Sequence, residues 1–173
     1  MMPVGPLMVE HRLIERWVTL LEPQGQQMEA EFLIASVDFL QTYADRIHHG
    51  KEEDILFHFL SEKALSTEHR RTMEDLIEEH VRMRRFVASL AHAGPRGEGW
   101  AGLQVLPQLY RAHIAKEDKQ FFLPAMTYLT PEEQAQVLDQ FREFDRRMIH
   151  EKCKAAVGAW EARAPQWAKH SRS

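Results

Sequence analysis

The sequence predicts an all-α protein, an antiparallel up-down four-helix bundle with an additional C-terminal helix. Apolar residues recur at helical spacing over long stretches, and the β-branched alternation typical of strands is absent. Glycine and proline cluster at a few points only, so long helices are joined by short loops. The chain also contains two weak copies of one helical hairpin, and two packed hairpins supply the four helices of a bundle.

Two helices are expected in the first third of the chain. One begins near Pro6 and ends at about Leu21, where the segment EPQGQQ interrupts it. The second starts near Met28 and continues to Ser61. Its apolar residues at helical spacing are Phe32, Ala35, Phe39, Tyr43 and Ile47. Gly50 weakens this helix by about 1 kcal/mol relative to alanine and is therefore a point where it can bend.

An N-cap residue and two helix-breaking sites predict the bounds of the next two helices. Ser66 is a suitable N-cap with Glu68 in the first turn, and the helix that it starts runs to about Ala93. The segment GPRGEG ends this helix. A fourth helix is expected over 101–123, with a kink at Pro107, because proline has no N–H to donate within a helix.

The clearest helix start is the segment TPEEQ. Thr130 caps the helix, Pro131 takes the first helical position, and Glu133 completes a capping box. A fifth helix is therefore expected over 131–163, and the remaining residues, 164–173, read as a frayed tail.

Length and composition favour one globular domain. A chain of 173 residues is long enough for a single domain with its own core. We expect that domain to span 1–163, with a core over 7–128, the extra helix over 131–163 and a flexible tail over 164–173. Hydrophobic residues make up 44% and charged residues 28%, as in soluble proteins. The net charge of −4 gives no general attraction to nucleic acid or anionic membranes.

The single cysteine and the N-terminal segment indicate the compartment. Cys153 cannot form an intramolecular disulfide, which suits a reducing cytoplasm. The segment MMPVGPLMVEHRLIERWV lacks the long apolar core of a signal peptide, and no apolar run approaches the roughly 20 residues that span a bilayer. We therefore expect a cytoplasmic monomer or homodimer with no nucleic-acid or membrane partner.

The internal repeat concentrates the histidines. HHGKEEDILF (48–57) and HIAKEDKQFF (113–122) both read His-x-x-Lys-Glu-acid and end in phenylalanine. Upstream, EHRLIERWV (10–18) matches EHVRMRRFV (79–87). The matched pairs are Glu10 with Glu79, His11 with His80, His48 with His113, Lys51 with Lys116, Glu52 with Glu117, and Phe57 with Phe122. Each copy therefore carries one histidine on its first helix and a His-x-x-x-Glu pair on its second.

This spacing suits a metal site. Residues four apart lie on one helix face, so each pair offers an imidazole nitrogen and a carboxylate oxygen to one point. Two hairpins packed around a pseudo-twofold axis turn both pairs inward. The candidate metal ligands are His11, His48, Glu52, His80, His113 and Glu117. Mixed nitrogen and oxygen ligation suits iron or manganese, with zinc as an alternative, and iron is favoured because di-iron sites of this kind recur in bundles.

A plainer alternative is a pair of solvated helix faces, because His-x-x-x-Glu spacing alone is a weak signal. The repeat distinguishes two occurrences of this spacing, His48–Glu52 and His113–Glu117, from the other occurrences in the chain. His49 lies one residue off the ligand face, so we expect it to face water together with Lys51 and Glu53. His69 lies about 16 Å along the helix axis from the candidate ligand on its own helix, too far for the same metal. His150 is expected to face solvent with Glu143, and Arg84 is expected to be a surface charge, though able to approach the site.

These blocks resemble the hemerythrin-like family, the HHE cation-binding domains, over about residues 7–128. The HxxKEE…LF and HIxKED…FFLP blocks resemble the two His-x-x-x-Glu elements of that family. EHR near the start and EEH at 78–80 resemble the segments that carry its lone histidines. The resemblance implies a four-helix bundle with a non-haem di-iron centre, two iron ions joined by an oxo or hydroxo bridge, that binds or reacts with oxygen, nitric oxide or peroxide.

The resemblance also implies residue roles. Glu52 and Glu117 would bridge the two irons. One iron would be ligated by His11 and His48, and the other by His80 and His113. Phe57 and Phe122 are expected to limit access of solvent to the site.

One departure bears on function. Respiratory hemerythrins have a second histidine one turn after the position of His80, and Arg84 stands there in this chain. The asymmetric five-histidine set of an oxygen carrier is therefore not evident, which favours peroxide or nitric oxide chemistry, or sensing. Three classes follow: a di-iron protein that binds or turns over a small oxidant, an iron- or oxygen-sensing module that acts through a partner without turnover, and a helical bundle without metal.

Overall fold

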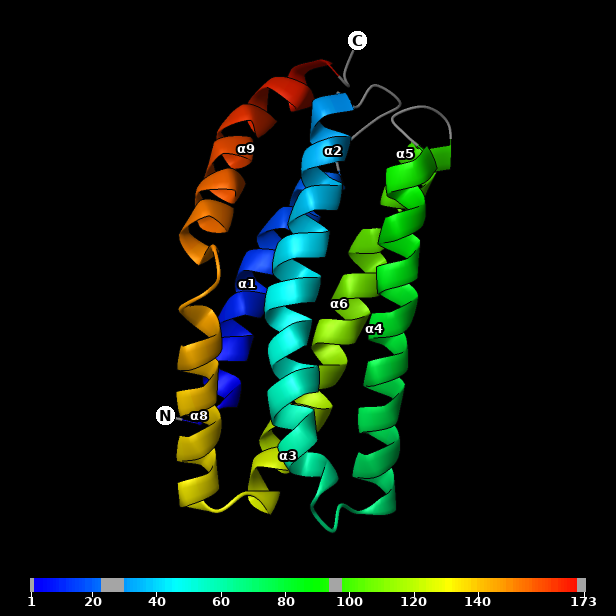
Figure 1. Cartoon of the computed structure of the whole chain (residues 1–173). Coiled ribbons are helices and arrows are strands. Elements are labelled where there is room, and N and C mark those ends of the chain that lie inside the picture. Colours follow the sequence, from blue (N-terminus) through cyan, green and yellow to red (C-terminus); the bar gives the residue numbers. More distant parts are fainter. Residues whose placement is uncertain (1, 23–29, 94–97, 171–173) are drawn as a thin grey trace.

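The computed structural model describes residues 2–22, 30–93 and 98–170, with side chains described over 2–22, 30–93 and 101–163. These residues form helices and turns and contain no β-strand, which confirms the predicted all-α class. Long helical rods lie side by side and make a bundle (Figure 1). Within the described part of the chain, no helix is both long enough and apolar enough to cross a bilayer.

The first rod is α1 (Val4–Leu21), close to the expected bounds. The second runs without a break through α2 (Ala30–Phe39), η1 (Leu40–His49), η2 (Glu52–Phe57) and α3 (His58–Ser61). The expected break at EPQGQQ and the start near Met28 fall almost entirely outside the described residues. η1 and η2 are π-helical, with hydrogen bonds from residue i to i+5, so each turn holds more residues than an α-helical turn.

Gly50 keeps helical backbone angles inside this rod, with φ −59° and ψ −42°. A Cβ atom at this position would lie 3.2 Å from Cζ of Phe144, which belongs to a later helix. The glycine therefore permits the close approach of another helix to the second rod.

The third rod is α4 (Thr67–Ala93). The hydroxyl of Ser66 accepts a hydrogen bond from the backbone N–H of His69 at 3.1 Å, which confirms the predicted cap. The segment that was expected to end this helix begins at 94–97, outside the described residues.

The fourth rod is divided, and the prediction of one helix over 101–123 with a kink was wrong. α5 (Glu98–Leu103) ends, and α6 (Leu106–Lys116) begins after a two-residue turn. Pro107 lies in the first turn of α6, because it has no N–H to donate to the carbonyl of Leu103 and cannot continue α5. The rod continues through η3 (Glu117–Phe121, π-helical), α7 (Phe122–Ala125) and a 3₁₀ turn, η4 (Met126–Tyr128).

The C-terminal segment forms two helices where one was expected. α8 (Pro131–Asp145) begins with the predicted capping box of Thr130 and Glu133, which the structure confirms. The chain then turns over 146–149, and α9 (His150–His170) extends beyond the expected end at residue 163. At the break, Met148 packs against the core, and Asp145 accepts a hydrogen bond from Nε2 of His150. The packing of Met148 and the ion pair of Asp145 with Lys51 are tertiary contacts, and they override the local helical propensity. α8 then lies beside η2 while α9 lies beside α1 (Figure 1).

The core consists of two apolar clusters separated by a polar layer. One cluster surrounds Trp17, Tyr43 and Tyr110, and the other surrounds Phe57 and Phe121. Buried polar residues come from the chain segments between the two clusters. Apart from Ser36, the buried polar residues of the described chain are Glu10, His11, His48, His49, Lys51, Glu52, His80, His113 and Glu117. Charged and imidazole groups are seldom fully buried without partners, so this layer is the candidate functional site.

Candidate metal centre

All six predicted ligands lie in the polar layer, and each is at most 3% exposed. They come from six different elements of the four rods. Their positions are His11 on α1, His48 on η1, Glu52 on η2, His80 on α4, His113 on α6 and Glu117 on η3. The structure therefore brings together side chains that are more than 100 residues apart in the sequence.

The ligand atoms gather into two groups that share Glu52. The first group contains His11, His48, Glu52 and Glu117, with Nε2 of His11 3.1 Å from Oε2 of Glu117 and Nε2 of His48 3.3 Å from Oε1 of Glu52. The second group lies on the other side of the carboxylates. Nε2 of His80 is 3.4 Å from Oε2 of Glu52, and Nε2 of His113 is 3.3 Å from Oε1 of Glu117. The two oxygens of each carboxylate thus face different groups, which is the placement that a bridging ligand requires.

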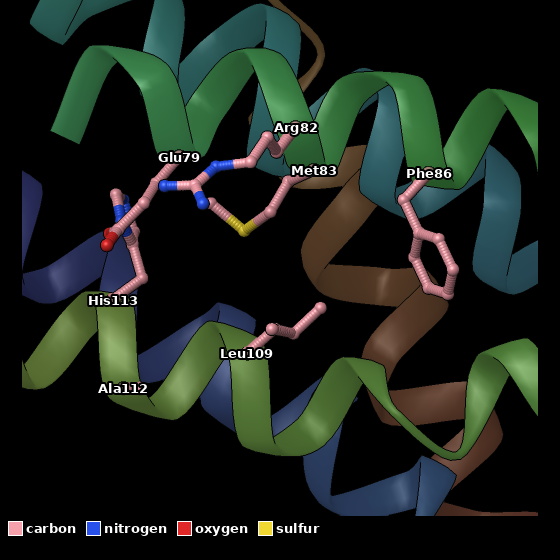
Figure 2. A pocket seen from close by; sticks show the side chains of 7 residues that line it. All are labelled: Glu79, Arg82, Met83, Phe86, Leu109, Ala112 and His113. Atoms are coloured by element: carbon pink, nitrogen blue, oxygen red, sulfur yellow. The ribbon is translucent and has the colours of Figure 1, made fainter. Parts of the chain in front are cut away.

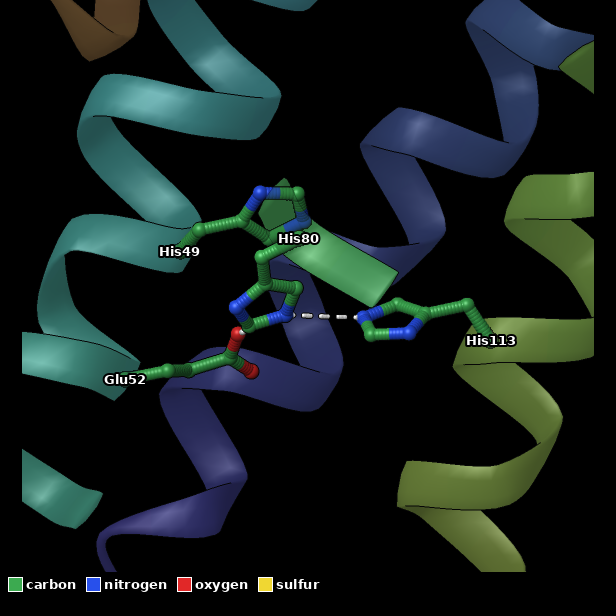
Figure 3. A group of neighbouring side chains, drawn as sticks. All are labelled: His49, Glu52, His80 and His113. Atoms are coloured by element: carbon green, nitrogen blue, oxygen red, sulfur yellow. Dashed lines mark hydrogen bonds and ion pairs between the residues drawn. The ribbon is translucent and has the colours of Figure 1, made fainter. Parts of the chain in front are cut away.

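His49 is a fourth member of the second group (Figure 3). Its ring stacks on His80 with centroids 3.9 Å apart, and only 2% of the residue is exposed, so the expectation that it faces water was wrong. The cause is the π-helical winding of η1, in which consecutive residues are separated by a smaller angle, so His48 and His49 both point inward. The structure therefore supplies a fifth histidine from a position other than that of Arg84. The second copy of the repeat has Ile114 at the matching place.

Each predicted histidine is oriented by a carboxylate on its outer side. The Nδ1–H donors and their acceptors are His11 to Asp118 (2.7 Å), His48 to Glu10 (3.0 Å), His80 to Glu53 (2.9 Å) and His113 to Glu79 (2.8 Å). A carboxylate can only accept, so Nδ1 carries the proton and the Nε2 lone pair points toward the centre. Such partners fix the tautomer and the ring orientation of a metal-binding histidine.

These carboxylates follow the internal repeat. Glu10 and Glu79 each precede a lone histidine and orient the other histidine of their own hairpin. The acids that follow the two bridging candidates, Glu53 and Asp118, orient the lone histidine of the opposite hairpin. Sequence reasoning assigned no role to these four acids. The repeat could have indicated their role, because Glu10 matches Glu79 and Glu53 matches Asp118 in the two copies.

Two lysines complete the repeat. Lys51 donates to Glu10, and Lys116 donates to Glu79. Lys51 is fully buried and also lies 2.9 Å from Oδ1 of Asp145 on α8, so the expectation that it faces water was wrong. Glu53 is partly buried rather than solvated, because it accepts from His80 and from Arg84.

The neighbouring imidazoles and cations lower the pKa values of three of these outer acids, Glu10, Glu53 and Glu79. The hydrogen bond from His113 lowers the pKa of Glu79 to about 2. Burial raises the pKa of Glu10, but the hydrogen bond from His48 and the charge of Lys51 outweigh it and leave that pKa below its ordinary value. Burial likewise raises the pKa of Glu53, and its bonds with His80 and Arg84 lower it further than burial raises it. As anions, Glu10, Glu53 and Glu79 accept from the Nδ1–H groups of His48, His80 and His113 and so favour that tautomer of each ring.

The centre of the layer fits metal ions. Among the described residues, several buried atoms that converge there have no hydrogen-bond partner. They are Nε2 of His11 and His48, and both carboxylate oxygens of Glu52 and Glu117. Each such group left unsatisfied costs about 1–3 kcal/mol, and more if it is charged. Lone pairs of nitrogen and oxygen that face one point are the donor set that iron, manganese or zinc accepts.

Two phenylalanines cover the histidine rings. Phe122 stacks on His11 with centroids 5.5 Å apart, and Phe57 lies parallel to His80 at 6.2 Å. Both are buried, so they separate the layer from one of the apolar clusters. This placement agrees with the expected limit on solvent access.

Other singled-out residues lie outside the two groups. His69 pairs with the hydroxyl of Tyr128 (2.7 Å) at one end of the bundle. His150 was expected to face solvent but is partly buried, with its ring edge-on to Tyr43. Glu143 is exposed, as expected. Arg84 was expected to be a surface charge, and it is half-exposed. It donates hydrogen bonds to Asp45 and Glu53 and so helps to hold Glu53, the carboxylate that orients His80.

The comparison with protein families agrees with this geometry. The family model described as Hemerythrin HHE cation binding domain matches residues 2–123 and so confirms the resemblance read from the repeat. The matched range contains both hairpin copies and ends before α8. No curated protein and no solved structure matches the chain. The family match covers well over half of its length, and the chain therefore belongs to the hemerythrin HHE cation-binding domain family.

Proposed function

We propose that this protein holds two iron ions in the polar layer and binds or reacts with a small oxidant, either oxygen, nitric oxide or peroxide. Manganese or zinc are the alternative metals. The proposal rests chiefly on two buried groups of nitrogen and oxygen atoms that share Glu52, together with Glu117, whose two carboxylate oxygens face His11 and His113. It includes the up-down antiparallel order of the four rods, which the family implies.

Each side chain of the layer has a distinct role in this proposal. Glu52 and Glu117 would hold both ions, and the five histidines would each ligate one ion. The outer carboxylates, such as Glu79 behind His113, fix the rings and strengthen the donors. Phe57 and Phe122 exclude water from the centre. A bound metal pair would supply the redox and Lewis-acid chemistry toward the oxidant.

The two halves of the site are unequal, and this bears on where the oxidant binds. The first group has two histidines, and the second has three. With the same two carboxylates on each side, the ion of the first group has one fewer protein donor. We therefore assign the oxidant to the first ion, next to His11 and His48.

Elemental analysis and an optical spectrum of freshly purified protein test the proposal. We expect two irons per chain and a near-ultraviolet band that is lost in Glu117→Ala and kept in Glu143→Ala, an exposed control on α8. Peroxide consumption above that of Glu117→Ala would identify an enzyme, whereas a stable complex without turnover would identify a carrier or sensor. Protein that binds no metal and folds equally well with a chelator would overturn the proposal.

An alternative is an iron- or oxygen-sensing module that acts through a partner. One observation favours it: buried Lys51 connects Glu10, next to the metal layer, to Asp145 at the end of α8. A change in the layer would thereby reach the C-terminal helices, which lie outside the matched family domain. Hydrogen exchange of α8 and α9 with and without metal tests this alternative, and unchanged protection would exclude it.

A further inference from the structure

A cavity of about 350 Å³ lies between α4 and α6, directly outside the metal layer (Figure 2). Its inner end is formed by His113 and by Glu79, which accepts from the Nδ1 of that histidine. The outer end is open to solvent, with Phe86 and Leu109 on facing helices. A volume of this size falls within the range of small-molecule sites in proteins.

The walls of the cavity are apolar. Met83 and Phe86 come from α4, and Leu109 and Ala112 come from α6. Leu109 is 41% exposed, so its apolar side chain is accessible from the open end of the cavity. An apolar body of a small molecule would therefore gain from entering between the two helices.

The cavity has one acidic and one basic side chain on its wall, Glu79 and Arg82, and they differ in whether they have partners. Glu79 is already engaged by His113 and Lys116, so its charge is balanced. Arg82 is exposed and lines the cavity, and no acidic side chain of the described chain pairs with it. A guanidinium offers a planar pair of donors that fits a carboxylate. Figure 2 shows the Arg82 side chain on the same side of α4 as Glu79 and Met83.

We infer that this cavity binds a small organic carboxylate with an apolar body. The carboxylate pairs with Arg82, and the body packs between Phe86, Leu109 and Met83. This inference goes beyond the proposed function, since the binding needs no reaction with an oxidant.

Calorimetric titration of the purified protein with octanoate, octanol and octylammonium tests the inference. Octanoate should bind at least about tenfold more tightly than either of the other two, because only it gains a charge-assisted bond. Arg82→Gln should weaken octanoate at least about tenfold and leave octanol unchanged. Arg85→Gln is the matched control, because this exposed arginine lies on the same helix and does not line the cavity.

A second variant tests the apolar body separately. Ala112 is exposed on the cavity wall, so Ala112→Phe should fill the space and abolish binding of both octanoate and octanol without unfolding the protein. Helical circular dichroism and metal content of each variant verify that fold and metal layer are intact. Equal octanoate affinity in Arg82→Gln and Arg85→Gln, or no binding to the unaltered protein, would overturn the inference. Failure of the di-iron proposal would instead appear as missing metal.

Discussion

The Nε2 atoms of His80 and His113 face each other at 3.0 Å, while the Nδ1 atom of each ring donates to a carboxylate. Two lone pairs at that distance repel, so a proton or a metal ion must lie between them. Burial lowers the pKa of His113, but Glu117 and Glu79 outweigh it and raise that pKa to about 9. A proton on this pair at neutral pH must therefore leave when a metal binds.

Metal uptake at pH 7 should release at least about one proton per chain. The sign follows from the pKa of His113, which lies above 7 without metal, so the ring is protonated until the metal takes the lone pair. Above about pH 9 this contribution should disappear. Calorimetry in buffers of different ionisation enthalpy measures the release, and a release that does not change between pH 7 and pH 10 would contradict the assignment.

His49→Ala should weaken the second metal position selectively. The substitution removes one of the three imidazoles of that group and leaves the first group intact. We expect the iron content to fall from two toward one per chain, as measured by elemental analysis after dialysis. His58→Ala is the control, because His58 is exposed on the same rod. If His49→Ala keeps both irons as firmly as the control does, His49 is not a ligand.

The outer carboxylates should set metal affinity without touching the metal. Glu10→Gln and Glu79→Gln should each lower iron affinity about 10–100-fold. His48 and His113 would then donate to a neutral amide oxygen in place of an anionic carboxylate, which orients the ring less firmly and makes it a weaker donor. Competition with a chelator measures the change, and Glu143→Gln serves as the exposed control. Wild-type affinity in both variants would show that ring orientation comes from packing alone.

The two lysines of the repeat should differ in their contribution to stability. Lys51→Met leaves Glu10 buried without its cation and should lower the free energy of unfolding by about 3–5 kcal/mol. Lys116 is 28% exposed, so Lys116→Met should cost only about 1 kcal/mol or less. Denaturant unfolding of matched preparations compares the two. Equal losses would mean that the burial of Lys51 beneath α8 has no energetic consequence.

Much of the fold and the six candidate ligands could be predicted because their signals are local or repeated. The capping box at Thr130 and the N-cap at Ser66 are short-range hydrogen bonds, which depend on few neighbours. The four-residue spacing of His48 and Glu52 puts them on one face by helix geometry alone, and the second copy marked this match among the chance ones.

The tertiary structure alone decided which additional side chains entered the layer. His49 turns inward because η1 is π-helical in the packed second rod. The spacing of apolar residues in the sequence does not distinguish a π-helix from an α-helix, so this orientation could not be predicted. Lys51 is buried because α8 closes over it, and α8 is separate from α9 because Met148 and Asp145 have partners in the core. The sequence by itself determined the all-α class, the two capped helix starts, the repeat and the six ligand candidates. The fifth histidine and the link to the C-terminal helices depend on long-range packing, which overrides local propensity.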